Sequence, residues 1–166
     1  METTDVLIKI RKIVRSINLE SKKIQKEYGV SIPQVLCLGF LRNSSGYQTT
    51  QGEIRKFLNL NASTVSGIIH RLEKKGFLAR LPSPVDKRVS VIALTSSGER
   101  LLNSIPSLLH EQLSAKLQTL DAESLEAMEK SLDLLVTLLN IGTLEASPMI
   151  TFEGDLEDQE DPEESD

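Results

Sequence analysis

Cysteine and aromatic residues are scarce in this sequence of 166 residues. The single cysteine, Cys37, cannot form a disulfide within the chain, which argues against a disulfide-stabilised secreted domain and predicts a reducing, cytoplasmic location. Trp is absent and aromatic residues make up 4%, so the core must be built from Leu, Ile and Val, a composition that favours helices. No run of about 18 apolar residues occurs, so we expect no membrane span.

Motifs for catalysis and metal binding are missing as well. The chain has two His and one Cys, and it lacks paired carboxylates, a Gly-rich phosphate loop and a nucleophile elbow. We therefore predict that it is not an enzyme and uses no cofactor. Zinc sites require clusters of Cys and His that this sequence does not contain. Cys37 lies in the apolar stretch VLCLGFL, which favours an inert core thiol over a redox sensor.

Charge is distributed unevenly along the chain, although the net charge is −5. Residues 1–100 contain 17 Lys and Arg against 8 Asp and Glu, whereas residues 101–166 contain 2 against 16. Such asymmetry indicates a part that binds nucleic acid and an acidic appendage. From Glu153 onward, 9 of 14 residues are acidic, and we predict that residues 145–166 form a disordered tail.

Apolar residues recur at helical spacing over most of the chain, and capping residues mark where the helices begin. Pro106 lies inside one apolar pattern and is expected to kink or restart that helix. The last helix is apolar over so wide an arc that it needs a partner. We predict helices at 4–27, 33–43, 51–59, 62–75, 96–117 and 122–140, strands at 77–81 and 89–94, and a loop at 44–49.

The middle of the chain has the pattern of a helix-turn-helix followed by a β-hairpin. A three-residue turn, NLN at 59–61, separates the helices predicted at 51–59 and 62–75. The two strands that follow are joined by the loop PSPVDKR, in which two prolines precede an acid and two bases. This order, two short helices and then a hairpin, predicts a winged helix-turn-helix.

Residues 50–98 resemble the MarR family of bacterial winged helix-turn-helix transcription regulators. The family's central pattern, close to (S/T)TVSRLIDRLEKKGLVER, is matched by STVS at 63–66 and by RLEKKGF at 71–77. Its Asp-x-Arg loop is matched by Asp86, Lys87 and Arg88, and its LTxxG by LTSSG at 94–98. The likeness extends more loosely over residues 5–142, and the acidic tail has no counterpart in the family pattern.

The resemblance implies a homodimer that binds a near-palindromic site on double-stranded DNA, in most members as a repressor. It implies a mainly α fold with a small β wing (α+β). The expected parts are an N-terminal dimerisation helix at 1–30, a DNA-binding lobe at 31–98, C-terminal dimerisation helices at 99–144 and the tail at 145–166. Many members release DNA when a small-molecule effector enters the cleft beside the lobe. Tyr28, Phe40 and Tyr47 could border such a cleft or lie in the core.

The helix at 62–75 is the predicted recognition helix, with Val65, Ile68, Ile69 and Leu72 facing inward. Its other face offers small polar groups and bases that suit the major groove, although such a face is also ordinary for a surface helix. Gly67 departs from the family, which usually has a large basic residue there. The predicted DNA-binding residues of this helix are Ser63, Thr64, Ser66, Gly67, His70, Arg71 and Lys74.

The wing is predicted to contact DNA through Lys87 and Arg88, with Arg88 in the minor groove. Asp86 would be repelled by phosphate, so we expect it to orient Arg88, or another arginine nearby, in a bidentate fork. Asp86 is also a typical turn former, and both roles can hold together.

The sequence allows more than one role for the acidic tail and two functions for the whole chain. The acidic tail could keep the protein soluble, fold back on the basic DNA-binding face, or contact a partner such as polymerase. The leading function is a dimeric DNA-binding regulator, and the alternative is a winged-helix module that binds an acidic protein partner without reading DNA.

Overall fold

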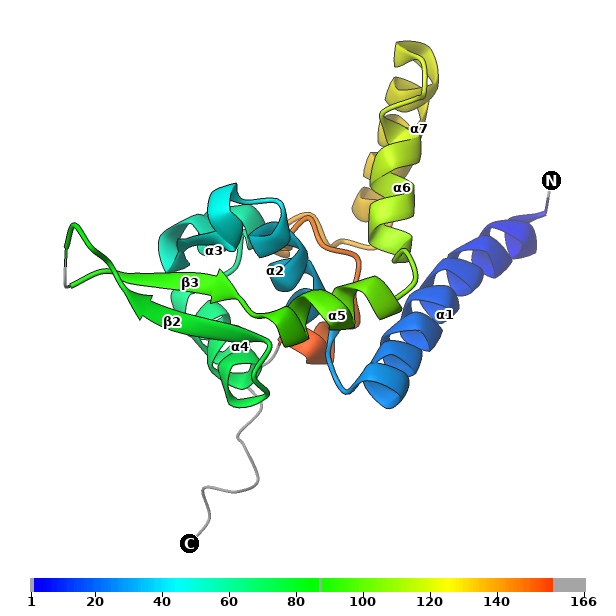
Figure 1. The fold of residues 1–166 in the computed structure, drawn as a ribbon. Helices are drawn as coiled ribbons and strands as arrows, with labels where there is room; N and C mark the ends of the chain where they lie inside the picture. Colours follow the sequence, from blue (N-terminus) through cyan, green and yellow to red (C-terminus); the bar gives the residue numbers. More distant parts are fainter. Residues whose placement is uncertain (1, 87, 157–166) are drawn as a thin grey trace, which may run out of the picture.

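The structure is a computed structural model that describes residues 2–86 and 88–156. It is mainly helical with one small antiparallel sheet, as predicted (Figure 1). The helices are α1 (Thr3–Tyr28), α2 (Ile32–Arg42), α3 (Gln51–Leu58), α4 (Ala62–Lys74), α5 (Ser96–Ser104), α6 (Leu109–Leu117) and α7 (Ala122–Leu138). The strands are β1 (Gln48–Thr50), β2 (Leu78–Pro82) and β3 (Ser90–Leu94), and 3-10 turns lie at Ser45–Tyr47 and, as η2, at Glu153–Leu156.

Local capping explains why most of the helices begin where they do. Each predicted capping side chain accepts a hydrogen bond from a backbone N–H in the first turn of its helix, which satisfies a group that otherwise lacks a partner. The α1 helix ends at Gly29, whose φ of 69° is left-handed and suits glycine. The caps are Ser31, Thr50, Asn61, Thr95 and Asp121.

The sheet has three strands in the order β1-β3-β2, which corrects the predicted loop at 44–49. Residues 48–50, which begin in that stretch and end one residue beyond it, form β1 and pair antiparallel with β3, so that Thr49 lies opposite Ile92. A strand of three residues is too short to show the alternation by which strands are recognised in a sequence. The added strand places the start of α3 against the base of the wing.

The core lies in the lobe around α2, which is buried along most of its length as its composition predicts. The inner face of α4 and the strand residues Leu78 and Ile92 pack into the same cluster. Cys37 is fully buried there, and burial raises the pKa of its thiol to about 12. The expected place of this cysteine in the core is thus confirmed.

The long apolar pattern after the wing is broken near Pro106, as predicted. The α5 helix ends at Ser104, and α6 begins only at Leu109. The backbone N–H of Leu109 donates to Glu20 Oε2 at 2.8 Å, so a side chain from α1 caps α6 from outside. Tyr28 Oη donates to the carbonyl of Ser104 at 3.1 Å, which ties the end of α1 to the end of α5.

The partly buried carboxyl of Glu20 leads to a prediction about pH. Burial raises the pKa of Glu20, so the folded state binds more protons than the unfolded chain just above the ordinary carboxyl pKa. The free energy of unfolding therefore falls as pH rises through that window. Glu20→Gln keeps an acceptor for Leu109 and carries no charge, so it should flatten this fall, measured by thermal unfolding from pH 4 to 7. Glu27→Gln removes the same charge from an exposed site on α1 and should not flatten it.

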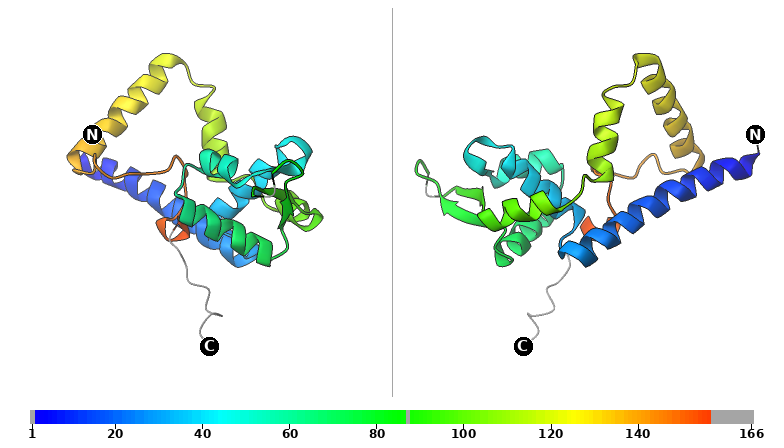
Figure 2. Two further views of the ribbon diagram at one scale, coloured as in Figure 1. Left: turned by 90° about the vertical axis from the view of Figure 1, so that its left-hand side faces the viewer. Right: turned by 45° about the vertical axis from the view of Figure 1, so that its right-hand side comes forward.

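The C-terminal helices α6 and α7 project away from the lobe (Figures 1 and 2). Neither contains a buried residue within this one chain, although both are rich in leucine. The exposed apolar side chains of α7 include Leu125, Met128, Leu132 and Leu138, and the C-cap residue Leu139 is exposed as well. The expectation of an apolar arc too wide for one chain to cover is confirmed.

The C-terminal segment at residues 145–156 lies against the rest of the chain, so the prediction of disorder from residue 145 is wrong for this part. Ser147 Oγ donates to the carbonyl of Leu58 at 2.8 Å, and Met149 packs on the core. The N–H of Ile150 donates to His110 Nδ1 at 3.3 Å. The acidic average of the tail hid these apolar anchors, and residues 157–166 lie outside the described part of the chain.

Candidate nucleic-acid interface

The helix-turn-helix is built from α3, a three-residue turn and α4. Asn59 ends α3 with a left-handed φ of 51°, a conformation that Asn tolerates, and its N–H donates to the carbonyl of Arg55. Asn61 then caps α4, because its side chain accepts from the N–H of Thr64 at 2.8 Å. The turn is thus fixed by two asparagines, and it sets the direction in which α4 leaves α3.

The two faces of α4 separate as the sequence predicts. Val65, Ile68, Ile69 and Leu72 are buried in the core. On the opposite side, four of the predicted DNA-binding residues are exposed, while two more lie half-buried at the border. The exposed residues are Ser63, Ser66, His70 and Lys74, and the border residues are Gly67 and Arg71.

Thr64 does not lie on the outward face, which corrects its place among the predicted base readers. Only 7% of the residue is exposed. It precedes Ile68 by four residues, and residues four apart share one face of a helix, so Thr64 turns toward the core. It borders a surface hollow together with Leu60 and Met149, on the side where the C-terminal segment lies.

Gly67 and Arg71 are related by one helical turn. A Cβ placed on Gly67 would lie 3.1 Å from Arg71 Nη2, so the guanidinium of Arg71 occupies space that a larger residue at 67 would fill. The missing side chain at position 67 is thus partly replaced by the arginine one turn later. A cation remains near this part of the outward face.

Gln51 and Arg80 extend the outward face beyond the residues that the sequence predicts. Gln51 Nε2 donates to Ser66 Oγ at 2.8 Å, and Arg80 Nη1 donates to Gln51 Oε1 at 3.3 Å. Arg80 also lies 3.6 Å from Glu73 Oε1. This chain of contacts joins α3, α4 and β2, and it holds an exposed arginine between the recognition helix and the wing. In the sequence, Arg80 could have been noticed as a basic residue near the end of the predicted strand at 77–81, just before the wing loop.

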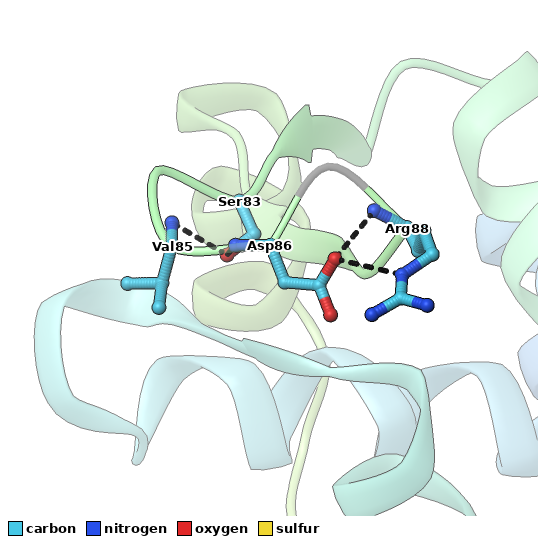
Figure 3. Close-up of polar contacts among 4 residues, drawn as sticks. All are labelled: Ser83, Val85, Asp86 and Arg88. Atoms are coloured by element: carbon cyan, nitrogen blue, oxygen red, sulfur yellow. Dashed lines mark hydrogen bonds and ion pairs between the residues drawn. The ribbon is translucent and has the colours of Figure 1, made fainter.

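The wing is fixed by side chains that accept backbone hydrogen bonds (Figure 3). Ser83 Oγ accepts from the N–H of Val85 at 3.2 Å and of Asp86 at 3.3 Å. Asp86 Oδ1 accepts from the N–H of Arg88 at 3.0 Å and from its Nε at 3.3 Å. The partner of Asp86 is therefore Arg88, and the turn-forming contact and the ion pair occur together.

The predicted bidentate fork between Asp86 and Arg88 is wrong in detail. A single carboxylate oxygen, Oδ1, accepts both from the backbone N–H of Arg88 and from its Nε, so the contact is not a fork that uses two oxygens (Figure 3). The Arg88 side chain is 91% exposed, so its remaining donors face solvent. Lys87, the other predicted contact of the wing, lies outside the described residues.

The three aromatic residues considered for an effector cleft have partners in the fold. Phe40 stacks on Phe57 with ring centroids 4.4 Å apart. Tyr47 Oη donates to Glu99 Oε1 at 3.4 Å, and Tyr28 bonds Ser104 as described above. These contacts give each ring a structural role in joining elements of the fold.

Among residues 2–86 and 88–156, no group of His, Cys, Asp and Glu is placed to hold a metal ion. No helix in the same part of the chain is long and apolar enough to cross a membrane. What the structure does bring together is a helix face of small polar groups and bases, an arginine on β2 and an arginine at the tip of a hairpin. A helix of this kind fits the major groove of DNA, and a flanking arginine fits the minor groove.

Comparison with known sequences finds that residues 28–89 match the sequence model of the MarR family. The HTH-type transcriptional regulator YsmB of Bacillus subtilis is 28% identical over 128 residues, which cover 77% of this chain and 86% of YsmB. The multiple antibiotic resistance protein MarR of Escherichia coli is 25% identical over 132 residues, which cover 75% of this chain and 90% of MarR.

Comparison with solved structures finds the same architecture. The S. aureus MepR–DNA complex superposes with a TM-score of 0.58 at 26% identity and covers 84% of this chain and 99% of MepR. Sco3205 of Streptomyces coelicolor, a MarR family transcriptional regulator solved in complex with DNA, gives a TM-score of 0.59 at 20% identity and covers 89% of this chain and 95% of Sco3205. The second likeness shows the fold alone.

Proposed function

Because the chain belongs to the MarR family of winged helix-turn-helix transcriptional regulators, we propose that it binds a near-palindromic operator as a homodimer and acts as a repressor. The observation that carries the proposal is the exposed polar and basic face of α4, which Gln51 links to Arg80 on β2 and which the exposed Arg88 of the wing follows along the chain. In this arrangement α4 lies in the major groove, and the wing reaches the flanking minor groove. The site of action is chromosomal DNA in the cytoplasm.

The proposed DNA contacts differ in kind. Ser63, Ser66 and His70 lie where they can reach base edges or phosphates, whereas Lys74 and Arg80 supply charge to the backbone. Arg88 is the proposed minor-groove contact, and Asp86 limits its orientations without touching DNA.

Thr64 is not proposed as a residue that reads bases, since it is buried. Contacts of Lys87 stay a proposal from the family pattern alone.

The proposed dimer uses the helices outside the lobe. The lobe is assigned to residues 31–98, and the dimerisation parts to residues 1–30 and 99–144. The apolar faces of α1 and α7 support this assignment, because they are exposed in one chain and would cover each other in two. A small-molecule effector that releases DNA, as in many members of the family, is proposed on the family relationship and not on a defined pocket.

The experiment that tests the function is selection of bound duplexes from a random-sequence pool, followed by sequencing. We expect an inverted repeat whose half-sites lie about one helical turn apart, as the symmetry of a dimer requires. Enrichment of no sequence would contradict the proposal. The alternative of a module that binds only protein is not supported, since MepR, similar over nearly its whole length, was solved on DNA.

Arg88→Ala is expected to weaken operator binding by about tenfold. The substitution removes an exposed cation from the wing without touching the core, so the loss should come from DNA contacts and not from folding. If the guanidinium lies against phosphates in the minor groove, the slope of log affinity against log salt should fall by about 0.9. Affinity measured by fluorescence anisotropy between 50 and 300 mM salt checks both numbers.

Two controls accompany this variant. Arg100→Ala removes the same charge from the exposed side of α5 and should leave the salt slope unchanged. Asp86→Ala keeps the arginine and removes both of its internal hydrogen bonds, so affinity should fall by less than in Arg88→Ala while the slope is retained. An unaltered slope in Arg88→Ala would refute the minor-groove assignment.

A further inference from the structure

One face of α1 carries a row of bases that the DNA-binding site does not use. The basic stripe consists of Arg11, Arg15, Lys22 and Lys26, at intervals of four, seven and four residues, which place them on one side of a helix. All four are exposed. Within residues 2–86 and 88–156, none of them has an acidic partner within ion-pair distance. Four cations that form no ion pair with the described residues make a surface suited to an anionic ligand.

The C-terminal segment leads directly to this stripe. Phe152 and Asp155 border a surface hollow of about 540 Å³ together with Lys22 and Lys26. The N–H of Phe152 donates to Oγ of the buried Ser21 at 3.2 Å. The 3-10 turn η2 therefore lies beside the C-terminal half of α1, where the second view of Figure 2 shows it. The last described residues of the chain are anchored next to the stripe.

The sequence that follows this anchor has the opposite charge. Residues 157–166 read EDQEDPEESD, with seven acids and no base. Ten extended residues reach at most about 33–36 Å. The stripe from Lys26 to Arg11 spans fifteen helical steps of about 1.5 Å, or about 22 Å. The length of the acidic end thus exceeds the length of the stripe by a margin that allows an irregular path.

We propose that residues 157–166 dock along the basic stripe of α1 in the same chain. Each exposed ion pair is weak by itself, but the anchor at η2 gives the acidic end an effective concentration near the millimolar range at the stripe. The stripe has the same chemistry as a phosphate-binding surface, so docking would shield it from nucleic acid. DNA would then meet α4 and the wing without competition from a second basic surface.

Zero-length carbodiimide cross-linking tests the docking without any DNA, because it joins a lysine to a carboxylate that it touches. We expect carboxylates within residues 157–166, told apart from Asp155 by fragment-ion sequencing, to be joined to Lys22 and Lys26, and we expect these products to disappear above about 0.5 M salt, where the Debye length is only a few Å. Products that join the acidic end mainly to Lys74 or Lys75 would overturn the proposal. So would products between labelled and unlabelled chains in an isotope-mixed sample.

A second measurement uses matched variants. A fluorophore on Ser165→Cys reports the motion of the acidic end through its anisotropy, and the native Cys37 is buried and stays unlabelled. Arg15→Gln with Lys22→Gln and Lys26→Gln should lower the anisotropy to its high-salt value. The control triple, Lys9→Gln with Lys12→Gln and Lys23→Gln, removes three exposed bases from another face of α1 and should leave the anisotropy unchanged. Equal effects of the two triples would contradict docking on the stripe.

The shielding is tested with a 30-base-pair duplex of random sequence at 50 mM salt. The chain truncated after Leu156 should bind it at least about fivefold more tightly than the full chain, with a steeper salt slope. Adding the stripe triple to the truncation should restore the affinity of the full chain. An unchanged affinity on truncation would overturn the shielding. Cross-linking and anisotropy do not involve DNA, so their failure is distinct from failure of the proposed operator binding.

Discussion

Leu132→Lys combined with Leu139→Lys is expected to convert the dimer into monomers and to weaken operator binding by about 100-fold or more. The two leucines lie seven residues apart, Leu132 on the apolar face of α7 and Leu139 at its C-cap, and they are 54% and 59% exposed in one chain. Burying two unpaired ammonium groups in a dimer interface is strongly unfavourable. Each freed lobe would bind one half-site without the gain from its linked partner.

Lysine is chosen because its positive charge distinguishes loss of the dimer from electrostatic repulsion of DNA as the cause of weaker binding. Two added cations attract DNA, so weaker operator binding could not come from electrostatic repulsion. The control is Glu126→Gln with Asp133→Asn, which changes the net charge by the same amount on the polar face of α7. Sedimentation equilibrium should find monomers for the leucine variant and dimers for the control. A leucine variant that remains dimeric would refute this assignment of the interface.

Gly98→Ala is expected to lower the free energy of unfolding by about 3 kcal/mol, although alanine ordinarily stabilises a helix. A Cβ at position 98 would lie 2.1 Å from the carbonyl oxygen of Phe77 and 2.7 Å from Leu94 Cδ1. The backbone oxygen cannot move easily, because it also accepts from the N–H of Thr95 at 3.2 Å. The first turn of α5 would have to separate from the start of the wing.

Gly52→Ala is the matched control for this substitution. Gly52 also lies in the first turn of a helix, α3, but it is exposed and an added Cβ would meet only Thr50 Oγ1 at 3.8 Å. Its replacement should raise the free energy of unfolding by up to about 1 kcal/mol. Urea unfolding followed by circular dichroism measures both changes. Effects of the same sign in the two variants would contradict the close approach at Gly98.

This comparison gives a physical meaning to one part of the family signature. In LTSSG, Thr95 caps α5 by accepting from the N–H of Gly98 at 3.1 Å, and its hydroxyl donates to the carbonyl of Gly76 at 2.6 Å. The threonine therefore links the end of the recognition helix to the start of α5. The glycine allows the two backbones to approach closely enough for that link to form.

The features that could be predicted from the sequence depend on short-range physics. Caps such as Asn61 and Asp121 contact backbone groups three residues away, so a short stretch of sequence contains both partners. The inner face of α4 follows from helical spacing in the same way. The turn-forming contact of Asp86 joins residues only two apart, so it could be predicted from the sequence in the same way.

The features that were missed depend on contacts between distant parts of the chain. Arg80 is positioned by Gln51, which is 29 residues away, and no local pattern links them. The C-terminal segment is held by Ser147 bonding Leu58, 89 residues away, so its acidic composition alone suggested disorder. Thr64 was assigned to the wrong face of α4 for a different reason. A small polar residue at the edge of an apolar helix face can lie toward the core or toward solvent.

The links between the lobe and the outer helices have a mechanical consequence. The chain passes between these two parts at residues 29–31, after α1, and at residues 105–108, after α5, and the segment at 145–156 returns to the lobe, where Ser147 bonds Leu58. The hydrogen bond from Tyr28 to Ser104 places the first two crossings side by side. Ile24 of α1 and Leu108 of the second crossing are buried in the same core as α2, so the lobe and the outer helices share packed side chains. In a dimer, this shared packing would hold the recognition helices at one distance from each other, and thereby set the spacing of half-sites that fits the protein best.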